Sequence, residues 1–232
     1  MGSKAKIAKF ILPIITNNMT NKRVYIEPFC GGCNSIMHVR GVRIANDKNK
    51  YLIAMWKSLC DGVKYPTIIN RDMYADVRNS YNKKDGRYSD DFIGWIGWMG
   101  SFNGRFFDGG YSGHNVNGRD YITEQIKNTL GQVEQLKGVK WESSNYSDIY
   151  YPDRSLIYCD IPYRNTKQYS TSKDFNYEDF YNWCKNMKDK GHTIFISEYW
   201  MPEDFICVWK KEVTNSMNQK NTKKTVEKLF TI

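Results

Sequence analysis

The sequence predicts an α/β fold in which buried strands alternate with helices. Apolar, β-prone runs at 24–26, 42–45 and 156–159 each lead into an acidic residue within two positions, and segments with helical apolar spacing separate these runs. A glycine-containing turn follows the first run. Open α/β sheets bind ligands at the carboxyl ends of their strands, so the acids there are the first candidates for a functional site.

The turn after the first strand has the features of a ligand-binding loop. Gly31 and Gly32 let the backbone approach a ligand, and we expect a helix behind them to point its N-terminal N–H groups at that ligand. Glu27, at the end of the strand, disfavours a phosphate and favours a cation. Asp47 follows about 20 residues later, the spacing of the acid that accepts a ribose hydroxyl in dinucleotide-binding folds.

The remaining elements follow from the same periodicities. Helices are expected at 6–15, where Pro13 breaks the pattern, and at 49–59, 124–136 and 177–188. Strands are expected at 139–142 and 193–197. Two further strand candidates flank the polar segment 214–225, which we expect to be a mobile loop.

The character of the sequence changes in residues 61–122, where charged residues, tyrosine, tryptophan and glycine interleave. We interpret this segment as an insertion that recognises a target. Trp95, Trp98 and Phe102 have helical spacing and are expected to pack in a core. Better candidates for nucleic-acid contacts are the hydrogen-bonding side chains, which can pair with base edges, namely Asn103, Arg105 and Arg119.

The tetrapeptide Asp160-Ile161-Pro162-Tyr163 is the strongest catalytic candidate. At the end of a buried strand, the Asp160 carboxylate and the Ile161 carbonyl could each accept one N–H of an exocyclic amine while Tyr163 stacks on its ring. Pro162 restricts the turn. The alternative interpretation is a strand-ending turn with an exposed aspartate and a packed tyrosine.

The composition favours a basic protein with one catalytic domain. The 232 residues are 41% apolar, and 34 Lys and Arg against 25 Asp and Glu give a net charge of +9. This charge favours a polyanionic partner such as DNA, although it could serve solubility alone. The six cysteines form no secreted disulfide pattern, and we expect a cytoplasmic protein without a signal peptide. Cys30 and Cys33 lack a second ligand pair at zinc-site spacing, so no metal is expected.

The loop Glu27-Pro28-Phe29-Cys30-Gly31-Gly32, Asp47 and the later tetrapeptide, in this order, resemble the Dam-like (D12 class) family of DNA adenine N6-methyltransferases. That family carries a Glu-Pro-Phe-x-Gly-Gly-type loop and an Asp-Pro-Pro-Tyr turn. The resemblance implies a Rossmann-like, S-adenosylmethionine-dependent methyltransferase sheet. Its catalytic domain would comprise residues 1–60 and 123–232, with 61–122 as the target-recognition insertion.

The resemblance also implies roles for individual residues. Lys4, in Gly2-Ser3-Lys4, would meet the methionine carboxylate of the cofactor, and the loop at Asn145 and Tyr146 would read its adenine. The full cofactor-binding set is Lys4, Glu27, Pro28, Phe29, Gly31, Gly32, Asp47, Asn145, Tyr146 and Asp160. Residues 196–199 resemble a strand end beside the catalytic pocket.

The implied reaction is methyl transfer from S-adenosylmethionine to N6 of an adenine that is flipped out of double-stranded DNA. Arg164 and Lys167 would hold the DNA backbone, Phe175 would wall the base pocket, and Lys223 and Lys224 would clamp phosphates. We expect a monomer or weak dimer in a bacterial cell or a phage-infected host. Alternatives are a methyltransferase that acts on RNA or a protein amide, and a catalytically decayed DNA-binding module.

Two positions depart from the family pattern. Ile161 replaces the first proline of the turn, which keeps the backbone carbonyl but removes one fixed φ. Cys33 stands where the loop often has another glycine, so either its φ is negative or the backbone lies farther from the cofactor.

Overall fold

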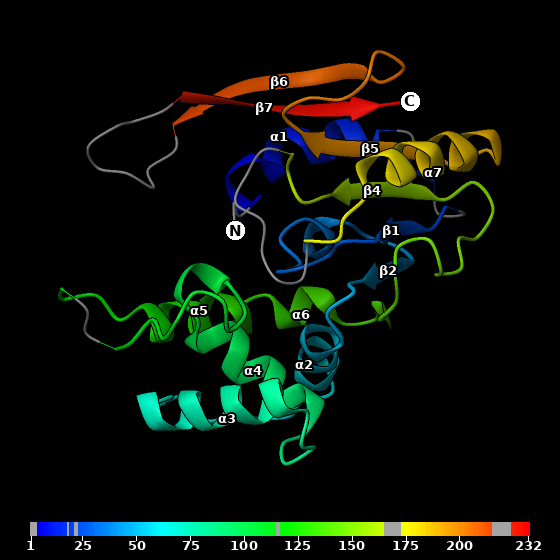
Figure 1. Cartoon of the computed structure of the whole chain (residues 1–232). Coiled ribbons are helices and arrows are strands. Elements are labelled where there is room, and N and C mark those ends of the chain that lie inside the picture. The colour runs from blue at the N-terminus through cyan, green and yellow to red at the C-terminus, as the bar shows by residue number, and fades with distance from the viewer. Residues whose placement is uncertain (1–3, 18, 21–22, 115–116, 165–172, 215–223) are drawn as a thin grey trace.

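The computed structural model of the chain describes residues 4–17, 19–20, 23–114, 117–164, 173–214 and 224–232 (Figure 1). These residues form a seven-stranded sheet with the strand order β3-β2-β1-β4-β5-β7-β6. Strands β3 to β5 are parallel, and β7 runs antiparallel to both β5 and β6. The α/β prediction is therefore confirmed.

The elements have the following bounds. The strands are β1 (Tyr25–Glu27), β2 (Arg43–Asn46), β3 (Lys140–Glu142), β4 (Leu156–Asp160), β5 (Thr193–Glu198), β6 (Ile206–Thr214) and β7 (Lys224–Thr231). The α-helices are α1 (Ala5–Thr16), α2 (Lys50–Cys60), α3 (Arg71–Lys83), α4 (Asp90–Gly100), α5 (Tyr121–Leu130), α6 (Val133–Leu136) and α7 (Tyr177–Asp189), and the short 3₁₀ helices are η1 (Ile36–His38) and η2 (Phe102–Gly104).

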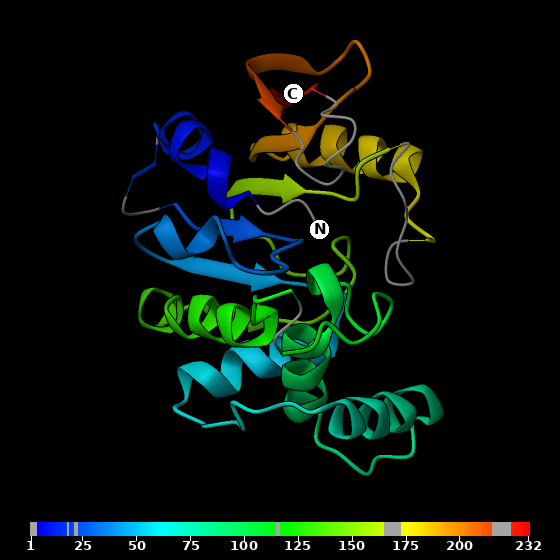
Figure 2. The ribbon, with the colours of Figure 1, turned by 90° about the vertical axis from the view of Figure 1, so that its left-hand side faces the viewer.

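Strand β4 is buried on both faces, as parallel strands in an α/β sheet are. Leu156 and Tyr158 point into the cluster that includes α1 and α2, whereas Ile157 and Cys159 point into the cluster of α7. Helices α1 and α7 accordingly lie on opposite sides of the sheet (Figure 2). This double burial explains why the apolar run at 156–159 indicated a central strand.

The segment 61–122 shares its core with the sheet domain. Figure 1 shows α3, α4 and α5 grouped below the sheet and joined to it through α2. Helix α4 packs closely on α2, because a Cβ at Gly94 would lie 2.0 Å from the backbone oxygen of Tyr51. Trp95 and Trp98 are buried, as predicted. The prediction for Phe102 is wrong: α4 ends at Gly100, and the Phe102 side chain is 41% exposed.

Two element predictions need correction, and a third is confirmed. Helix α1 continues through Pro13, because Pro13 lies on the exposed face while Ile11 and Ile15 bury the opposite face. The expected helix at 124–136 is two helices, α5 and α6, interrupted between Leu130 and Val133. The strands flanking the polar segment 214–225 are confirmed as β6 and β7, whereas residues 215–223 lie outside the described part of the chain.

Candidate active site

The parallel register brings the predicted acids to one edge of the sheet. Tyr25 and Ile26 of β1 pair with residues 156 and 157 of β4, so Glu27 and Asp160 both lie at carboxyl strand ends. Asp160 also pairs with Ser197 of β5, which places Glu198 at the same edge. Residues that are far apart in the sequence therefore meet where the fold class predicts a site.

The glycine loop leaves β1 as a series of turns. The N–H of Cys30 donates to the Asn46 carbonyl (2.8 Å), and the N–H of Cys33 donates back to the Cys30 carbonyl (2.7 Å). The predicted α-helix behind the loop is absent from this described segment, which contains only the three-residue η1. The N–H groups of Cys30 and Cys33 therefore stabilise the turns of the loop itself.

Gly31 and Cys33 both adopt the left-handed backbone region, with φ of +46° and +55°. Of the two alternatives predicted for Cys33, a negative φ is therefore excluded. A non-glycine residue rarely adopts this region, and here the buried Cys33 side chain (0% exposed) packs in the core. Cys33 therefore adopts the left-handed backbone geometry that glycine usually supplies in such a turn.

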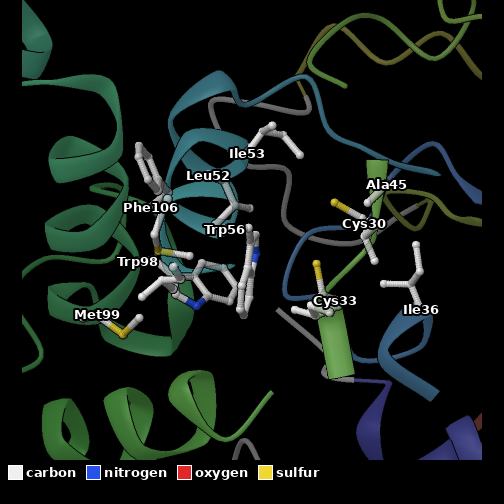
Figure 3. Packing of buried hydrophobic residues seen from close by; sticks show 14 of the residues in the cluster. Cys30, Cys33, Ile36, Ala45, Leu52, Ile53, Trp56, Trp98, Met99 and Phe106 are labelled. Carbon is white, nitrogen blue, oxygen red and sulfur yellow. The ribbon is translucent and has the colours of Figure 1, made fainter. Parts of the chain in front are cut away.

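Side chains from the helices below the sheet hold the loop in place. The Trp56 indole N–H donates to the Gly31 carbonyl (3.0 Å), and the Gln132 amide donates to the Gly32 carbonyl (3.0 Å). Trp98 lies so close to Gly32 that a Cβ at residue 32 would be 3.0 Å from its ring. Figure 3 shows Trp56 and Trp98 beside each other near Cys33. Packing against Trp98 therefore disfavours any residue larger than glycine at position 32.

Asp47 lies beside this loop, where a ribose acceptor was predicted. One carboxylate oxygen accepts the Gly31 N–H (3.0 Å), and the other accepts the Asn49 N–H (2.9 Å). Burial raises the pKa of Asp47, and these two hydrogen bonds act against that rise. Because a carboxylate offers about four acceptor positions, Asp47 can still accept a ligand hydroxyl.

Glu27 is an acid buried without an ion-pair partner among the described residues, with 3% exposure. It accepts a hydrogen bond from the Tyr25 hydroxyl (2.8 Å). Burial raises the pKa of Glu27 to about 8, and the nearby Asp160 raises it further in spite of the Tyr25 hydrogen bond. A cation placed here would stabilise the ionised form.

The predicted catalytic turn, residues 160–163, is surrounded by charged groups from distant parts of the sequence. Lys4 lies 3.3 Å from Asp160 and 3.4 Å from Glu227 of β7, and its ammonium group lies 4.2 Å from the Tyr163 ring centroid. Lys4 also donates to the Tyr163 hydroxyl, which in turn donates to Glu227 (2.7 Å). Asp160, Tyr163, Lys4 and Glu227 thus form one network, which we call the turn network.

Opposite charges within the turn network favour one another's ionised forms, whereas burial acts against them. Burial raises the pKa of Asp160, while the ammonium of Lys4 lowers it. Burial works against the Lys4 cation, but Asp160 and Glu227 together raise the pKa of Lys4 above its ordinary value. Lys4 therefore favours the ionised Asp160 that could accept hydrogen bonds from an amine.

The rest of the tetrapeptide fixes the turn. The Ile161 side chain is buried (2% exposed) in the α7 cluster, so its replacement of a proline is compensated by packing. The Pro162 carbonyl accepts a hydrogen bond from the Tyr177 hydroxyl (2.9 Å). These contacts anchor both residues between Asp160 and Tyr163.

Two functional neighbours come from the end of β5. The carboxylate of Glu198, which is 1% exposed, accepts the backbone N–H groups of Arg164, Tyr199 and Trp200. The Tyr199 ring contacts the Tyr163 ring edge to face at 4.5 Å. Residues 196–199 therefore lie beside the catalytic turn, as the resemblance implied.

An aromatic cluster borders the loop on the α7 side. Phe29 lies 5.3 Å from Tyr146 and 5.8 Å from Phe175, measured between ring centroids. Tyr146 and Phe175 are also in contact (6.0 Å). Asn145, next to Tyr146, is exposed. The structure thus joins the predicted adenine-reading loop to Phe29, and places Phe175 in the same cluster.

Other predicted DNA-contacting residues lie beside the turn, lie at η2, or fall outside the described part of the chain. The Arg164 guanidinium lies beside the turn, 5.6 Å from the Tyr177 ring and 5.7 Å from the Trp200 ring. Asn103 has a left-handed φ of 55° in η2, and Arg105 follows it. Lys167 and Lys223 and the side chain of Lys224 lie outside the described part of the chain.

Arg119 lies near η2 but is already engaged. Its guanidinium forms paired hydrogen bonds with Glu124 (2.6–3.0 Å) and lies 4.8 Å from the Tyr121 ring. Tyr121 also contacts Phe102 of η2 (6.2 Å). A base contact by Arg119 would therefore require it to exchange Glu124 for the base.

Sequence reasoning missed several residues that shape the site. Glu227, Trp56, Trp98 and Gln132 all act through contacts between segments that are distant in the sequence. Only the burial of Trp56 and Trp98 had a local signal, their apolar helical spacing. Within the described residues, no group of three or more His, Cys, Asp or Glu side chains is arranged to hold a metal, and no helix is long and apolar enough to cross a bilayer.

Comparison with known proteins gives a family for the first part of the chain. No curated protein sequence matches it. Among solved structures, the chain is similar to the candidate methyltransferase SMU.472 complexed with SAH, with 12% sequence identity and a TM-score of 0.42. That match covers 100% of this chain and 52% of the other, so the chain spans about half the length of that protein.

The family model that matches is that of the D12 class N6 adenine-specific DNA methyltransferases, over residues 1–96. This range includes Lys4, the glycine loop and Asp47. The family expected from the sequence motifs is therefore confirmed: residues 1–96 carry the pattern of the D12 class of N6 adenine-specific DNA methyltransferases.

Proposed function

We propose that the chain transfers a methyl group from S-adenosylmethionine to N6 of adenine in specific sequences of double-stranded DNA. The observation that carries this proposal is the pairing of two acids at one edge of the sheet, Glu27 beside the glycine loop and Asp160 in the turn network. The first suits a cationic cofactor and the second suits an amine substrate. The family match over residues 1–96 supports the same reaction.

The residues around the loop fit S-adenosylmethionine. Glu27 is a buried acid whose pKa of about 8 keeps it mostly protonated at neutral pH, and the ammonium and sulfonium groups of this cofactor would stabilise its ionised form. Asp47 would accept the ribose hydroxyls, and Phe29 and Tyr146 would border the adenine ring. Pro28, Gly31 and Gly32 would complete the loop, and Lys4 would reach the methionine carboxylate.

When bound, the cofactor supplies an electrophilic methyl group on a sulfonium. The chain's own task is to orient the adenine amine, whose lone pair is delocalised into its ring. The Asp160 carboxylate and the Ile161 carbonyl would accept the two N–H groups, and these bonds strengthen as positive charge develops on the nitrogen. Tyr163 would stack on the base. The Pro162 contact with Tyr177 keeps the accepting atoms in place.

The target base must leave the DNA stack to reach this turn, which costs a few kcal/mol. We propose residues 1–60 and 123–232 as the catalytic domain and 61–122 as the target-recognition segment. Trp98 of that segment touches Gly32 and also lies 3.5 Å from the Cβ position of Gly104, next to Asn103. The proposed recognition residues and the cofactor loop therefore rest on the same side chain.

The test is incubation of the purified chain with unmethylated genomic DNA and labelled S-adenosylmethionine, followed by nucleoside analysis and mapping of modified sites. We expect N6-methyladenine at one short motif. Asp160→Ala should lower the methylation rate by about 10²–10³-fold or more, while DNA retention stays near wild type. Near-wild-type methylation by this variant would overturn the role of Asp160.

The outcomes also separate the alternatives. Cofactor binding without DNA labelling would point to an RNA or protein amide substrate. If the chain neither binds the cofactor nor labels DNA, the result would point to a decayed DNA-binding module. Asp160→Asn is the matched control for Asp160→Ala, because it keeps the shape of the side chain while removing its charge.

A further inference from the structure

The hairpin of β6 and β7 forms a hollow beside the catalytic turn. The hollow has a volume of about 690 Å³ and is lined by residues 199, 210–212, 225, 226 and 228. Lys228 of β7 is the register partner of Glu198, the last residue of β5. The hollow therefore lies at the carboxyl edge of the sheet. Tyr199 lines it and contacts Tyr163 of the turn network. The hollow therefore adjoins the turn at residues 160–163 through Tyr199.

The lining is basic. It carries three lysines, Lys210, Lys211 and Lys228, against one acid, Glu212. Lys210 and Lys211 are exposed. A region with this excess of ammonium groups attracts anions.

Two of these lysines face each other across the hairpin. Lys210 of β6 and Lys228 of β7 are register partners in the antiparallel pair. Directly opposed side chains in such a pair have Cβ atoms about 4.5–5.5 Å apart, and like charges at that distance destabilise the sheet. An anionic group bound by both ammonium groups would remove this repulsion.

The basic surface continues towards α1. The Lys211 ammonium lies 3.5 Å from the Phe10 ring centroid, and Lys9 lies 5.1 Å from the same centroid. The Phe10 ring is stacked on Trp209 of β6 at 6.2 Å. The aromatic pair thus fixes the hairpin to α1, with Lys9 and Lys211 both close to the Phe10 ring.

We propose that this hollow binds the phosphate backbone of the DNA strand whose adenine enters the catalytic turn. The inference rests on the proposed function, because DNA is favoured over other polyanions by the direct contact between Tyr199 in the hollow and Tyr163 in the turn. Lys210 and Lys228 bind one stretch of backbone between them, whereas Lys211, whose register partner is Glu227, lies against Phe10 of α1. Phosphate contacts of this kind position the duplex without reading its sequence.

The test measures binding of a fluorescein-labelled DNA duplex to the full chain over a range of salt concentrations. The double variant Lys210→Gln and Lys228→Gln should reduce the slope of log affinity against log salt by about 2, since each phosphate contact contributes about 1. The loss should be equal for duplexes with and without the target motif. The matched control is Lys188→Gln with Lys190→Gln, two exposed lysines that precede β5 at the opposite edge of the sheet.

The result that supports the proposal is a reduced slope in the hollow variant, a wild-type slope in the control, and unchanged binding of S-adenosylmethionine in both. A wild-type slope in the hollow variant, or an equal reduction in the control, would overturn it. Failure of the proposed function has a different signature, because the wild-type chain would then leave DNA unmethylated. Calorimetric cofactor binding shows that each variant is folded.

Discussion

The glycine loop and the catalytic turn lie at the same sheet edge but are held by different kinds of contact. The loop carbonyls accept hydrogen bonds from an indole and an amide, those of Trp56 and Gln132, within a packed apolar core. The turn is held by charged side chains, Lys4 and Glu227, which come from near opposite ends of the sequence. The shape of the loop should therefore depend on packing, whereas the turn should depend on ionisation.

The largest expected effect tests the dependence of the glycine loop on packing. Trp98→Ala removes a buried ring against Gly32 and should lower the free energy of unfolding by about 3–5 kcal/mol. It should also weaken cofactor binding, because the loop loses its support, while the pH dependence of methylation keeps its wild-type midpoint. Urea unfolding and calorimetric titration with S-adenosylmethionine measure the two effects.

The matched control for Trp98 is Trp95→Ala in the same helix. Trp95 is 1% exposed, but its indole donates to the Pro66 carbonyl and its ring stacks on Tyr65 at 5.0 Å, away from the loop. We expect a similar loss of stability with wild-type cofactor affinity under conditions where the variant is folded. Equal losses of affinity in both variants would contradict a specific link between Trp98 and the loop.

The next prediction tests the dependence of the turn on ionisation. Lys4→Met leaves Asp160 and Glu227 without their cation, so burial raises the pKa of Asp160 further and less of it is ionised at neutral pH. Methylation at neutral pH should fall by about tenfold or more and recover as the pH is raised. The measurement is the pH profile of the single-turnover rate at saturating cofactor.

Lys4→Arg keeps the charge and serves as the control for Lys4→Met. The acid limb of the pH–rate profile of Lys4→Arg should stay near the wild-type position. If Lys4→Met instead raises the KM for cofactor and leaves the pH profile unmoved, Lys4 acts on the methionine carboxylate alone and not through Asp160.

The last prediction sharpens the comparison within the loop itself, where Glu27 is the ionisable exception. Its pKa of about 8 lies above the ordinary 4.5, so the folded chain without cofactor binds a proton that the unfolded chain has released between these values. Stability without cofactor should therefore fall as the pH rises from about 4.5 to about 8, and saturating cofactor should reduce this slope.

Cofactor affinity should show the corresponding dependence. A cation that binds ionised Glu27 must displace the proton below pH 8, so affinity should fall about tenfold per pH unit below about 8 and level off above it. Calorimetry across this range tests the expectation. Glu27→Gln should abolish the dependence, and a persistent slope in that variant would assign the proton to another group.

The sequence predicted the parts of the site that depend on a few adjacent residues. Asp160 could be placed at a strand end because residues 156–159 form an uninterrupted apolar run, and the structure confirms that strand as β4. Asp47 was found by its spacing from Glu27. Such signals are local, so a single sequence is enough to reveal them.

The parts that escaped prediction depend on tertiary contacts. Glu227 is separated from Tyr163 by 64 positions, and nothing in the β7 sequence distinguishes it from an ordinary exposed strand residue. The expected helix behind the glycine loop failed because the left-handed Cys33 turns the backbone away from a helical path. Phe102 failed because helical spacing continues in the sequence after α4 has ended.

The turn network has a consequence for synthesis of the chain on the ribosome. Lys4 and Glu227 are 223 positions apart, so a nascent chain exposes Lys4 and Asp160 long before β7 can join the sheet. Until then Tyr163 lacks the carboxylate that accepts its hydroxyl proton, and β5 has an open edge where β7 will pair. Catalytic competence should therefore appear only after this last strand has emerged, which couples activity to completion of the sheet.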